Sequence, residues 1–174
     1  RNTAQTLTAE DAAAMVRDCP SVKASSPLVG TAGQLIYGNS NWLPNQMLGV
    51  GEGFEQIGTW QVLEPGRFFN SSDIKSSSKV CVIGQTVRKK LFQTRNPLGE
   101  TIRIKKIPFK VVGVLKEKGT DLVGSDQDNI VLMPYSTVRK RLQGSSFNNV
   151  DIIFVSAKNQ GKMTEATYEI TQLL

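Results

Sequence analysis

The sequence contains no histidine, and only two of its 174 residues are cysteine. The absence of histidine removes the commonest general base and the commonest transition-metal ligand together. Two cysteines, Cys19 and Cys81, cannot form a structural zinc site without further ligands. They can form one disulfide in an oxidising compartment or be two buried thiols. The second alternative is favoured, because both fall in apolar segments. We therefore expect no metal and no cofactor.

Long apolar runs are also lacking. No window approaches the roughly 18 consecutive apolar residues of a membrane span, and the longest runs, such as 111–115 and 152–155, are the length of a strand. The sequence shows no initiator Met and no signal-peptide pattern. It opens at Arg1 and ends at Leu174 within an unfinished helical pattern. We expect it to be a fragment of a larger protein.

Aromatic residues make up only 7% of the chain, although its net charge is +6. The positive balance raises a basic nucleic-acid-binding domain as one alternative. A binder of single strands would intersperse aromatic residues among its charges, and here only Phe92 and Phe109 are near them. Groups such as residues 88–90 and 139–141 are instead typical of solvated helix faces. Attraction to acidic lipid head groups or to an acidic partner surface stays open, and nucleic acid is not the partner we expect.

Two serine motifs match part of a catalytic pattern. Ser72 with Lys75, and Ser76 with Lys79, fit the S-x-x-K spacing of serine acylases. Both lie in a serine-rich stretch where such matches arise by chance, and no K-T-G follows. We interpret them as surface residues of a loop over 71–78.

Two other motifs match ligand-binding loops in part. Residues 126–129 start like a calcium loop, but apolar residues follow and no Glu stands at the twelfth position. Residues 49–53 resemble a dinucleotide fingerprint without its third glycine. The sequence has no G-x-x-x-x-G-K-[ST], so we expect no ATP binding. We predict no catalytic, cofactor-binding or metal-binding residues and expect that the domain is not an enzyme.

The periodicity of apolar residues predicts a series of short helices and strands. Thr8 to Asp11 reads as a capping box before the first helix, which Pro20 ends. Residues 64–67 read as a type II turn with a positive φ at Gly66. Residues 35–37 and 47–50 are expected to form a hairpin around a polar turn at 38–41. Residues 101–105 alternate apolar and basic side chains as in a strand with one wet face, and 109–115 are its expected hairpin partner. The remaining expected strands are 22–29 (interrupted at Pro27), 80–83, 109–115, 129–133 and 150–155, and the remaining helices start near Phe54, Gly84, Ser136 and Met163. Residues 117–128 are expected to form a long polar loop.

The order of these elements predicts an α+β fold with two lobes. Both ends of the chain combine one helix with strands, so each is half of a βαβ unit that needs the other half to bury its helix. The middle is richer in short strands and turns. We predict one lobe formed by residues 1–37 and 148–174, and a second, strand-rich α/β lobe inserted between them as residues 38–147.

The motifs of the middle region resemble those of one known family. Residues 66–69 are similar to its G-R-x-F turn, and 80–92 are similar to its V-x-V-I-G…L-F strand and helix. Residues 97–102 resemble P-L-G-x-x-I, and 109–115 resemble F-x-V-V-G-V-L. An acidic loop then leads to Pro134, which begins P-Y-S-T. Five motifs in order make the chain resemble the MacB-like periplasmic core domain of ABC transporter permeases.

This resemblance implies a fold and a context. The lobe made from the chain ends corresponds to a porter-like lobe, and the insertion to the small lobe called Sabre. It also implies membrane helices on both sides in the full protein, a homodimeric or heterodimeric permease, and an ATPase on the same or a partner chain. The domain would lie on the periplasmic or outer side of the bacterial inner membrane.

The function implied is mechanotransmission, the coupling of cytoplasmic ATP hydrolysis to movement outside the membrane. In the efflux branch of the family the domain docks a periplasmic adaptor (membrane fusion) protein that leads to a TolC-like channel. The alternative within the family is a lipoprotein-release or cell-division permease that docks another periplasmic partner. The matched motifs are turn and core positions, so they assign no partner-binding residues.

Overall fold

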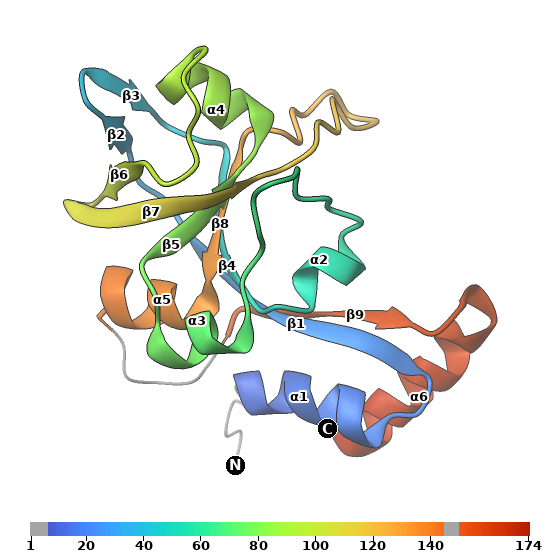
Figure 1. Ribbon diagram of the computed structural model, residues 1–174. Coiled ribbons are helices and arrows are strands. Elements are labelled where there is room, and N and C mark those ends of the chain that lie inside the picture. The colour runs from blue at the N-terminus through green and yellow to red at the C-terminus, as the bar shows by residue number, and fades with distance from the viewer. Residues whose placement is uncertain (1–6, 145–149) are drawn as a thin grey trace.

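The computed structural model describes residues 7–144 and 150–174, which form an α+β fold around one mixed sheet (Figure 1). The predicted α+β class is confirmed. The helices are α1 (Ala9–Asp18), α2 (Phe54–Ile57), α3 (Ser71–Ser76), α4 (Gln85–Phe92), α5 (Tyr135–Thr137), the π-helical turn η1 (Val138–Leu142), the 3-10 turn η2 (Gln160–Lys162) and α6 (Met163–Leu173). The strands are β1 (Val22–Thr31), β2 (Leu35–Tyr37), β3 (Ser40–Trp42), β4 (Gln46–Val50), β5 (Val80–Ile83), β6 (Thr101–Ile104), β7 (Ile107–Val114), β8 (Ile130–Pro134) and β9 (Ile152–Ala157).

The described strands follow the order β3-β2-β6-β7-β5-β8-β4-β1-β9 across the sheet. Strand β1 is the link between the chain ends and the middle of the chain. Its first part pairs antiparallel with β9 from Val22 to Leu28, and its last part pairs antiparallel with β4 from Leu28 to Thr31. Strands β4 and β8, and strands β5 and β7, pair in parallel. Two segments far apart in the sequence therefore become neighbours through β1.

The predicted interruption of this strand at Pro27 is wrong, because β1 continues through the proline. The carbonyl of Leu28 accepts the N–H of Asp151 on the β9 side, so the neighbouring residue, Pro27, turns its backbone toward β4. The ladder with β4 stops at Val50, which pairs with Leu28. Proline is tolerated there because no ladder hydrogen bond is lost.

The middle of the sheet is covered on both faces. Helix α4 packs Val87, Leu91 and Phe92 on one face, above the buried residues of β5, β6 and β7. On the other face α2, α3 and the segment 58–70 enclose a second cluster that includes Phe68 and Phe69. Helices α1 and α6 lie together at the lower end of the molecule, around a third, smaller cluster (Figure 1).

Several local predictions are confirmed. The Thr8 side chain accepts the N–H of Asp11, and the Asp11 carboxylate accepts the N–H of Thr8, which completes the capping box of α1. Strands β6 and β7 form the expected hairpin, and β6 alternates buried and exposed residues. The helix expected from Ser136 is also present, although from Val138 it winds as a π-helix.

The predicted hairpin of 35–37 with 47–50 is wrong. Strand β2 pairs with β3 and with β6, whereas β4 pairs with β1 and β8. Residues 40–42 form a strand because two contacts hold the Trp42 side chain in place. Its indole N–H donates to Asn129 Oδ1 at 2.8 Å, and Lys90 lies over its ring. The periodicity of apolar residues gives no information about such contacts between distant residues.

The predicted surface loop over 71–78 is also wrong, since residues 71–76 form α3. The helix starts because Asn70 accepts the N–H of Asp73 while Asp73 accepts the N–H of Asn70. This reciprocal pair is a capping box built from Asn and Asp. The serine-rich composition hid the helix.

Gly66 does not have the positive φ predicted for it. It is glycine for a different reason, because a Cβ atom there would lie 3.0 Å from Gly113 Cα and 3.1 Å from the Leu63 carbonyl oxygen. The turn at 64–67 therefore lies directly on β7.

The division into two lobes at residues 37/38 and 147/148 stays a prediction. Residue 147 lies outside the described residues, and the described strands of the chain ends and of the middle belong to one continuous sheet. In the described part of the chain no helix is both long enough and apolar enough to cross a membrane.

Candidate functional site

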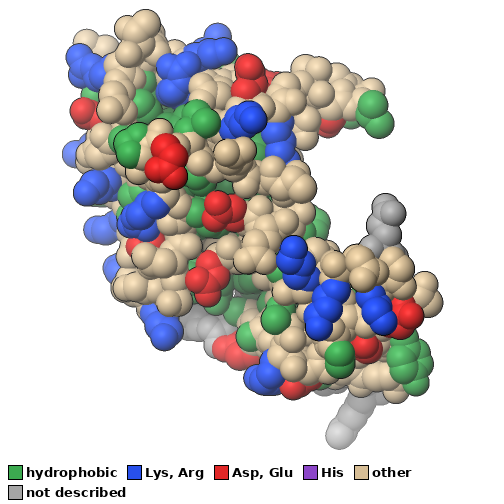
Figure 2. Space-filling model, turned by 45° about the vertical axis from the view of Figure 1, so that its right-hand side comes forward, with side chains coloured by type: hydrophobic (Ala, Val, Ile, Leu, Met, Phe, Trp, Pro, Cys, Tyr) green, Lys and Arg blue, Asp and Glu red, His purple; other side chains and the backbone are tan. Residues whose placement is uncertain are grey.

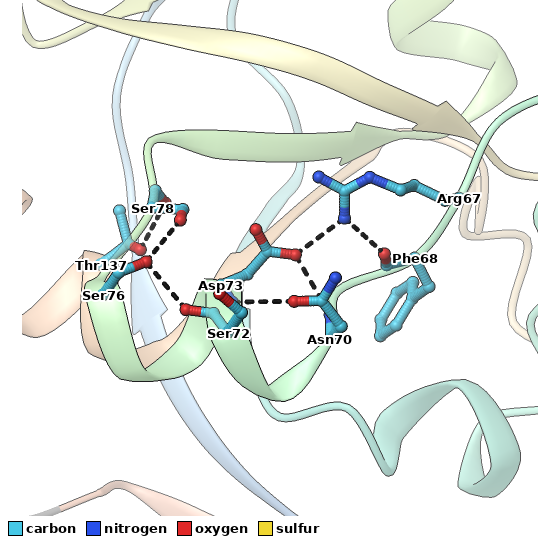
Figure 3. A network of polar contacts seen from close by, with 8 residues as sticks. All are labelled: Arg67, Phe68, Asn70, Ser72, Asp73, Ser76, Ser78 and Thr137. Carbon is cyan, nitrogen blue, oxygen red and sulfur yellow. Dashed lines mark hydrogen bonds and ion pairs between the residues drawn. The ribbon is translucent and has the colours of Figure 1, made fainter.

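In the two S-x-x-K motifs, the Ser76 hydroxyl makes hydrogen bonds within its own segment. The Ser76 hydroxyl donates to the Ser72 carbonyl at 2.8 Å and lies 2.7 Å from the Ser78 hydroxyl (Figure 3). In residues 7–144 and 150–174, neither serine hydroxyl contacts Lys75 or Lys79, so no nucleophile is paired with a base.

The acidic loop 126–128 uses its carboxylates to order the chain. Asp126 accepts the hydroxyl of Thr86 at 2.6 Å and the N–H of Asp128 at 2.9 Å. The buried Asp128 carboxylate accepts the N–H groups of Lys118 and Gly119, both at 2.8 Å. These oxygens bind N–H and O–H donors of the protein itself. Among the described residues no group of three possible metal ligands gathers.

The glycines of 49–53 allow close packing of the backbone. A Cβ atom on Gly53 would lie 2.3 Å from the carbonyl oxygen of Ser25, so β1 passes directly over this turn. Helix α2 that follows has only four residues. The motif therefore packs against β1, and the helix after it is too short to present the N-terminus that a phosphate needs.

The two cysteines are free and buried in different clusters, which confirms the favoured interpretation. Cys19 lies with Met15 and Ala166 between α1 and α6, whereas Cys81 lies under α4. Burial raises the pKa of both thiols. Neither is a reactive nucleophile.

The arginine of the G-R-x-F motif connects three segments through hydrogen bonds (Figure 3). Its Nη1 donates to Asp73 Oδ2 at 2.8 Å and to the Phe68 carbonyl at 3.1 Å, and the Arg67 N–H donates to the Val112 carbonyl at 2.9 Å. Burial raises the pKa of Asp73, but hydrogen bonds from Arg67 and Asn70 and the charge of Arg67 outweigh it, so that the pKa lies below its ordinary value. The sequence motif marked Arg67 but gave no sign of its partner Asp73.

A groove of about 790 Å³ runs between α1 and the middle of the chain. Its floor is formed by small residues of α1, including Ala12 and Ala13, and by β1 from Lys23 to Pro27. Its far wall is the turn 51–53 with α2 and α3. The charged side chains that line it are Lys23, Lys75, Glu52 and Glu55. The groove marks the place where β1 joins the two parts of the fold.

Residues 116–128 form an arm that projects from the body, and Figure 2 shows an open, concave space between this projection and the lower part of the molecule. At its tip Leu122 is fully exposed and Val123 is 85% exposed. Asp121 holds the tip, because its Oδ1 accepts the N–H groups of Val123 and Ser125. The sequence predicted only a polar loop here. An apolar pair inside a polar loop was the signal that could have indicated the tip.

The base of the arm is anchored to the segment after α2. The Lys118 ammonium donates to the Gly58 carbonyl at 2.5 Å and lies 3.8 Å from the centre of the Trp60 ring. Burial lowers the pKa of Lys118, against the smaller opposite effect of Asp128. The arm is therefore an ordered projection, and its two tip residues are presented to solvent at a fixed position.

Solved structures with the same fold define the class. The periplasmic region of MacB from Actinobacillus actinomycetemcomitans matches with a TM-score of 0.81 at 26% identity, over 98% of this chain and 74% of that one. The extracellular domain of the ABC-type transporter YknZ from Gram-positive bacteria has a TM-score of 0.79 over 97% of this chain and 82% of that one. At 20% identity the second likeness shows the fold alone. The chain is an α+β domain of an ABC transporter permease that lies outside the cytoplasm.

Sequence relatives identify the family. The model of the MacB-like periplasmic core domain matches residues 1–173. The chain is 41% identical over 146 residues to the macrolide export ATP-binding/permease protein MacB of Syntrophobacter fumaroxidans, covering 84% of this chain and 20% of that protein. It is 35% identical over 170 residues to the pyoverdine export ATP-binding/permease protein PvdT of Pseudomonas aeruginosa, covering 97% and 25%. The chain therefore belongs to the MacB-like periplasmic core domain family, and the resemblance stated from its motifs is confirmed. It spans a fifth to a quarter of the length of these relatives.

Proposed function

We propose that this domain transmits movement within an inner-membrane exporter, with no chemistry of its own, and that it docks a periplasmic adaptor leading to a TolC-like channel. A separate ATPase would drive the movement, and two permeases would pair in the membrane. Two relatives are named as a macrolide export protein and a pyoverdine export protein, which supports export as the direction of transport.

The observation that carries the mechanical part is the pairing of β1 with both β4 and β9. Helices α1 and α6 lie side by side, and the Glu169 carboxylate accepts the N–H and the hydroxyl of Ser21 at 2.8 and 2.9 Å. Membrane helices attached at this end would displace α1 and α6 as one body. Strand β1 would pass that displacement to β4 and the rest of the sheet, as in rigid-body lobe motion.

The joint between β1 and the β4–α2 turn depends on one buried hydroxyl. Ser26 is fully buried, and its Oγ accepts the Gly51 N–H at 2.9 Å while donating to the Pro27 carbonyl. Substitution Ser26→Ala leaves the Gly51 N–H without a partner, which costs about 1–3 kcal/mol locally. In the intact transporter we expect ATP hydrolysis to continue while export falls, because the joint is looser.

A matched control for this substitution is Ser77→Ala. Ser77 is also a buried serine, but within the part of the chain that the structure describes its hydroxyl has no hydrogen-bond partner. Export and ATP hydrolysis are measured in parallel for both variants, together with thermal unfolding of the domain. Unchanged export in a stably expressed Ser26→Ala transporter would refute transmission through β1.

The arm carries the docking part of the proposal. An ordered projection with two exposed apolar side chains is typical of a contact with a partner. The double substitution Leu122→Ser/Val123→Ser should weaken binding of a purified adaptor about tenfold or more, because both side chains would be buried in the complex. Binding is measured by a pull-down and by titration with the 174-residue domain.

Leu43→Ser is the control for loss of an exposed apolar residue, since Leu43 is 59% exposed and lies away from the arm, after β3. Neither variant should change thermal stability by more than about 0.5 kcal/mol. If the native domain binds no adaptor, the alternative of a lipoprotein-release or cell-division partner takes the place of efflux. If the Leu122→Ser/Val123→Ser domain binds as the native one does, the arm is not the contact.

A further inference from the structure

The hairpin of β6 and β7 has one covered face and one bare face. Ile102, Ile104 and Phe109 are fully buried on the side of α4. The alternating residues, Arg103 and Lys110, are exposed on the opposite side. The apolar cluster on that side includes residues of β5 and the end of β7, and it contains none from β2 or β6. This end of the sheet is therefore open to solvent on one face.

The register of the strands gathers the exposed side chains. Arg103 pairs with Pro108 on β7 and with Ile36 on β2, and Thr101 pairs with Lys110. Side chains of directly paired residues lie on the same face of a sheet. The bare face thus combines two cations with exposed aliphatic groups, and Ile36 is 44% exposed.

The turn of the hairpin adds two more cations at a conformational cost. Lys105 and Lys106 have φ values of 51° and 68°. A two-residue hairpin turn with positive φ at both positions favours Asn-Gly, and other residues are strained there. The chain nevertheless places two lysines at this tip. Strain that local folding does not require indicates a role for the charges themselves.

These four cations are not neutralised within the described part of the protein. Arg103 makes one long hydrogen bond, of 3.5 Å, to the Lys106 carbonyl. None of the ion pairs of residues 7–144 and 150–174 includes Arg103, Lys105, Lys106 or Lys110. Residues 101–114 contain no Asp or Glu. In Figure 2 basic side chains line the left edge of the molecule, the side on which Figure 1 places β6 and β7.

We propose that this basic hairpin, residues 101–114, docks an acidic surface of a partner protein. A flat sheet face with cations spaced between aliphatic groups matches a protein surface that carries carboxylates. It offers no exposed aromatic side chain on which a nucleic-acid base could stack. It also lies at the opposite end of the fold from α1 and α6 (Figure 1). If those helices face the membrane, a step that rests on the proposed function, the hairpin points away from lipid.

The test compares two variants of the 174-residue chain with equal net charge. The first is Arg103→Gln/Lys105→Asn/Lys106→Gly/Lys110→Gln, which removes four charges from the hairpin. The second removes four charges from exposed lysines elsewhere, as Lys23→Gln/Lys75→Gln/Lys140→Gln/Lys158→Gln. Binding of fluorescent poly-L-glutamate is titrated at low and at physiological salt. Vesicles containing phosphatidylserine and a single-stranded DNA oligonucleotide are titrated in parallel.

We expect the native chain to bind poly-L-glutamate, and the hairpin variant to bind it about tenfold more weakly or worse, with the control variant within about threefold of native. We also expect Lys105→Asn/Lys106→Gly alone to raise the melting temperature by about 2–4 °C while it weakens binding, because it relieves the turn. Equal weakening in both four-site variants, or in neither, would overturn the proposal. It would also be overturned if vesicles or DNA bind more tightly than poly-L-glutamate through the hairpin.

Discussion

Gly113→Ala is expected to destabilise the domain by about 3 kcal/mol, as overpacking of a closed core does. A Cβ atom at this position would lie 2.5 Å from the Arg67 carbonyl oxygen and 3.0 Å from Val62 Cγ1. The opposing backbone cannot move away freely. The Arg67 N–H is bonded to Val112, and the Leu63 N–H is bonded to Val114 at 2.8 Å. The G-R-x-F turn thus packs directly on the glycine of the F-x-V-V-G-V-L motif.

Gly30→Ala is the matched control, because Gly30 is also a strand glycine. Among residues 7–144 and 150–174, its added Cβ would meet only the Asp151 carboxylate, at 3.8 Å. The control should leave stability unchanged or raise it by up to about 1 kcal/mol. Urea unfolding monitored by Trp fluorescence measures both variants. Equal stability of Gly113→Ala and the native chain would show that the turn does not rest on β7 as described.

Asp73→Ala should cost about 2 kcal/mol at neutral pH, since it removes the cap of α3 and the partner of Arg67 together. The effect should also depend on pH. Because the pKa of Asp73 is lower in the folded protein than in the unfolded chain, its contribution is complete above the unfolded value of about 3.9 and is lost as pH falls through the folded value. The stability difference between the native chain and the variant should therefore shrink progressively as the pH falls below about 3.9.

The control for this substitution is Asp18→Ala. Asp18 pairs with Arg17 at 2.9 Å, but both side chains are exposed. A fully exposed pair contributes little to the free energy of unfolding, so we expect no measurable loss of stability. Urea midpoints from pH 3 to 7 distinguish the two variants. A loss of stability for Asp73→Ala that is small, or that persists unchanged at pH 3, would contradict a stabilising role for the contact between Arg67 and Asp73.

The elements that the sequence predicted correctly are those decided by neighbouring residues. The capping box at Thr8, the hairpin of β6 with β7 and the helix after Gly84 depend on spacings of a few residues. The wrong predictions involve distant partners. Nothing in residues 47–50 indicates that they pair with β1 and β8 rather than with 35–37. The strand at 40–42 depends on Asn129, 87 residues beyond Trp42.

The candidate site, like the fold, could be predicted from the sequence only where it depends on neighbouring residues. The motifs gave the position of Arg67 and of the glycines that pack under it, but the pairing with Asp73 required the helix that the serine-rich stretch concealed. The alternation in 101–105 correctly predicted a wet face. The arm tip at Leu122 was missed, because a polar loop carries no periodicity from which its projection could be predicted. Exposure of an apolar pair is a property of the fold.

The double pairing of β1 has a consequence for the order in which the domain matures. Residues 22–31 can associate with β4 once the first 50 residues are available, but β9 arrives only with residues 152–157. Until then the early half of β1 is an unpaired edge, and Cys19 and Met15 lack the cover of Ala166. Contacts that close such long stretches of chain form slowly and expose aggregation-prone edges meanwhile. We therefore expect the part of the fold built from the two chain ends, where β1 pairs with β9, to form last.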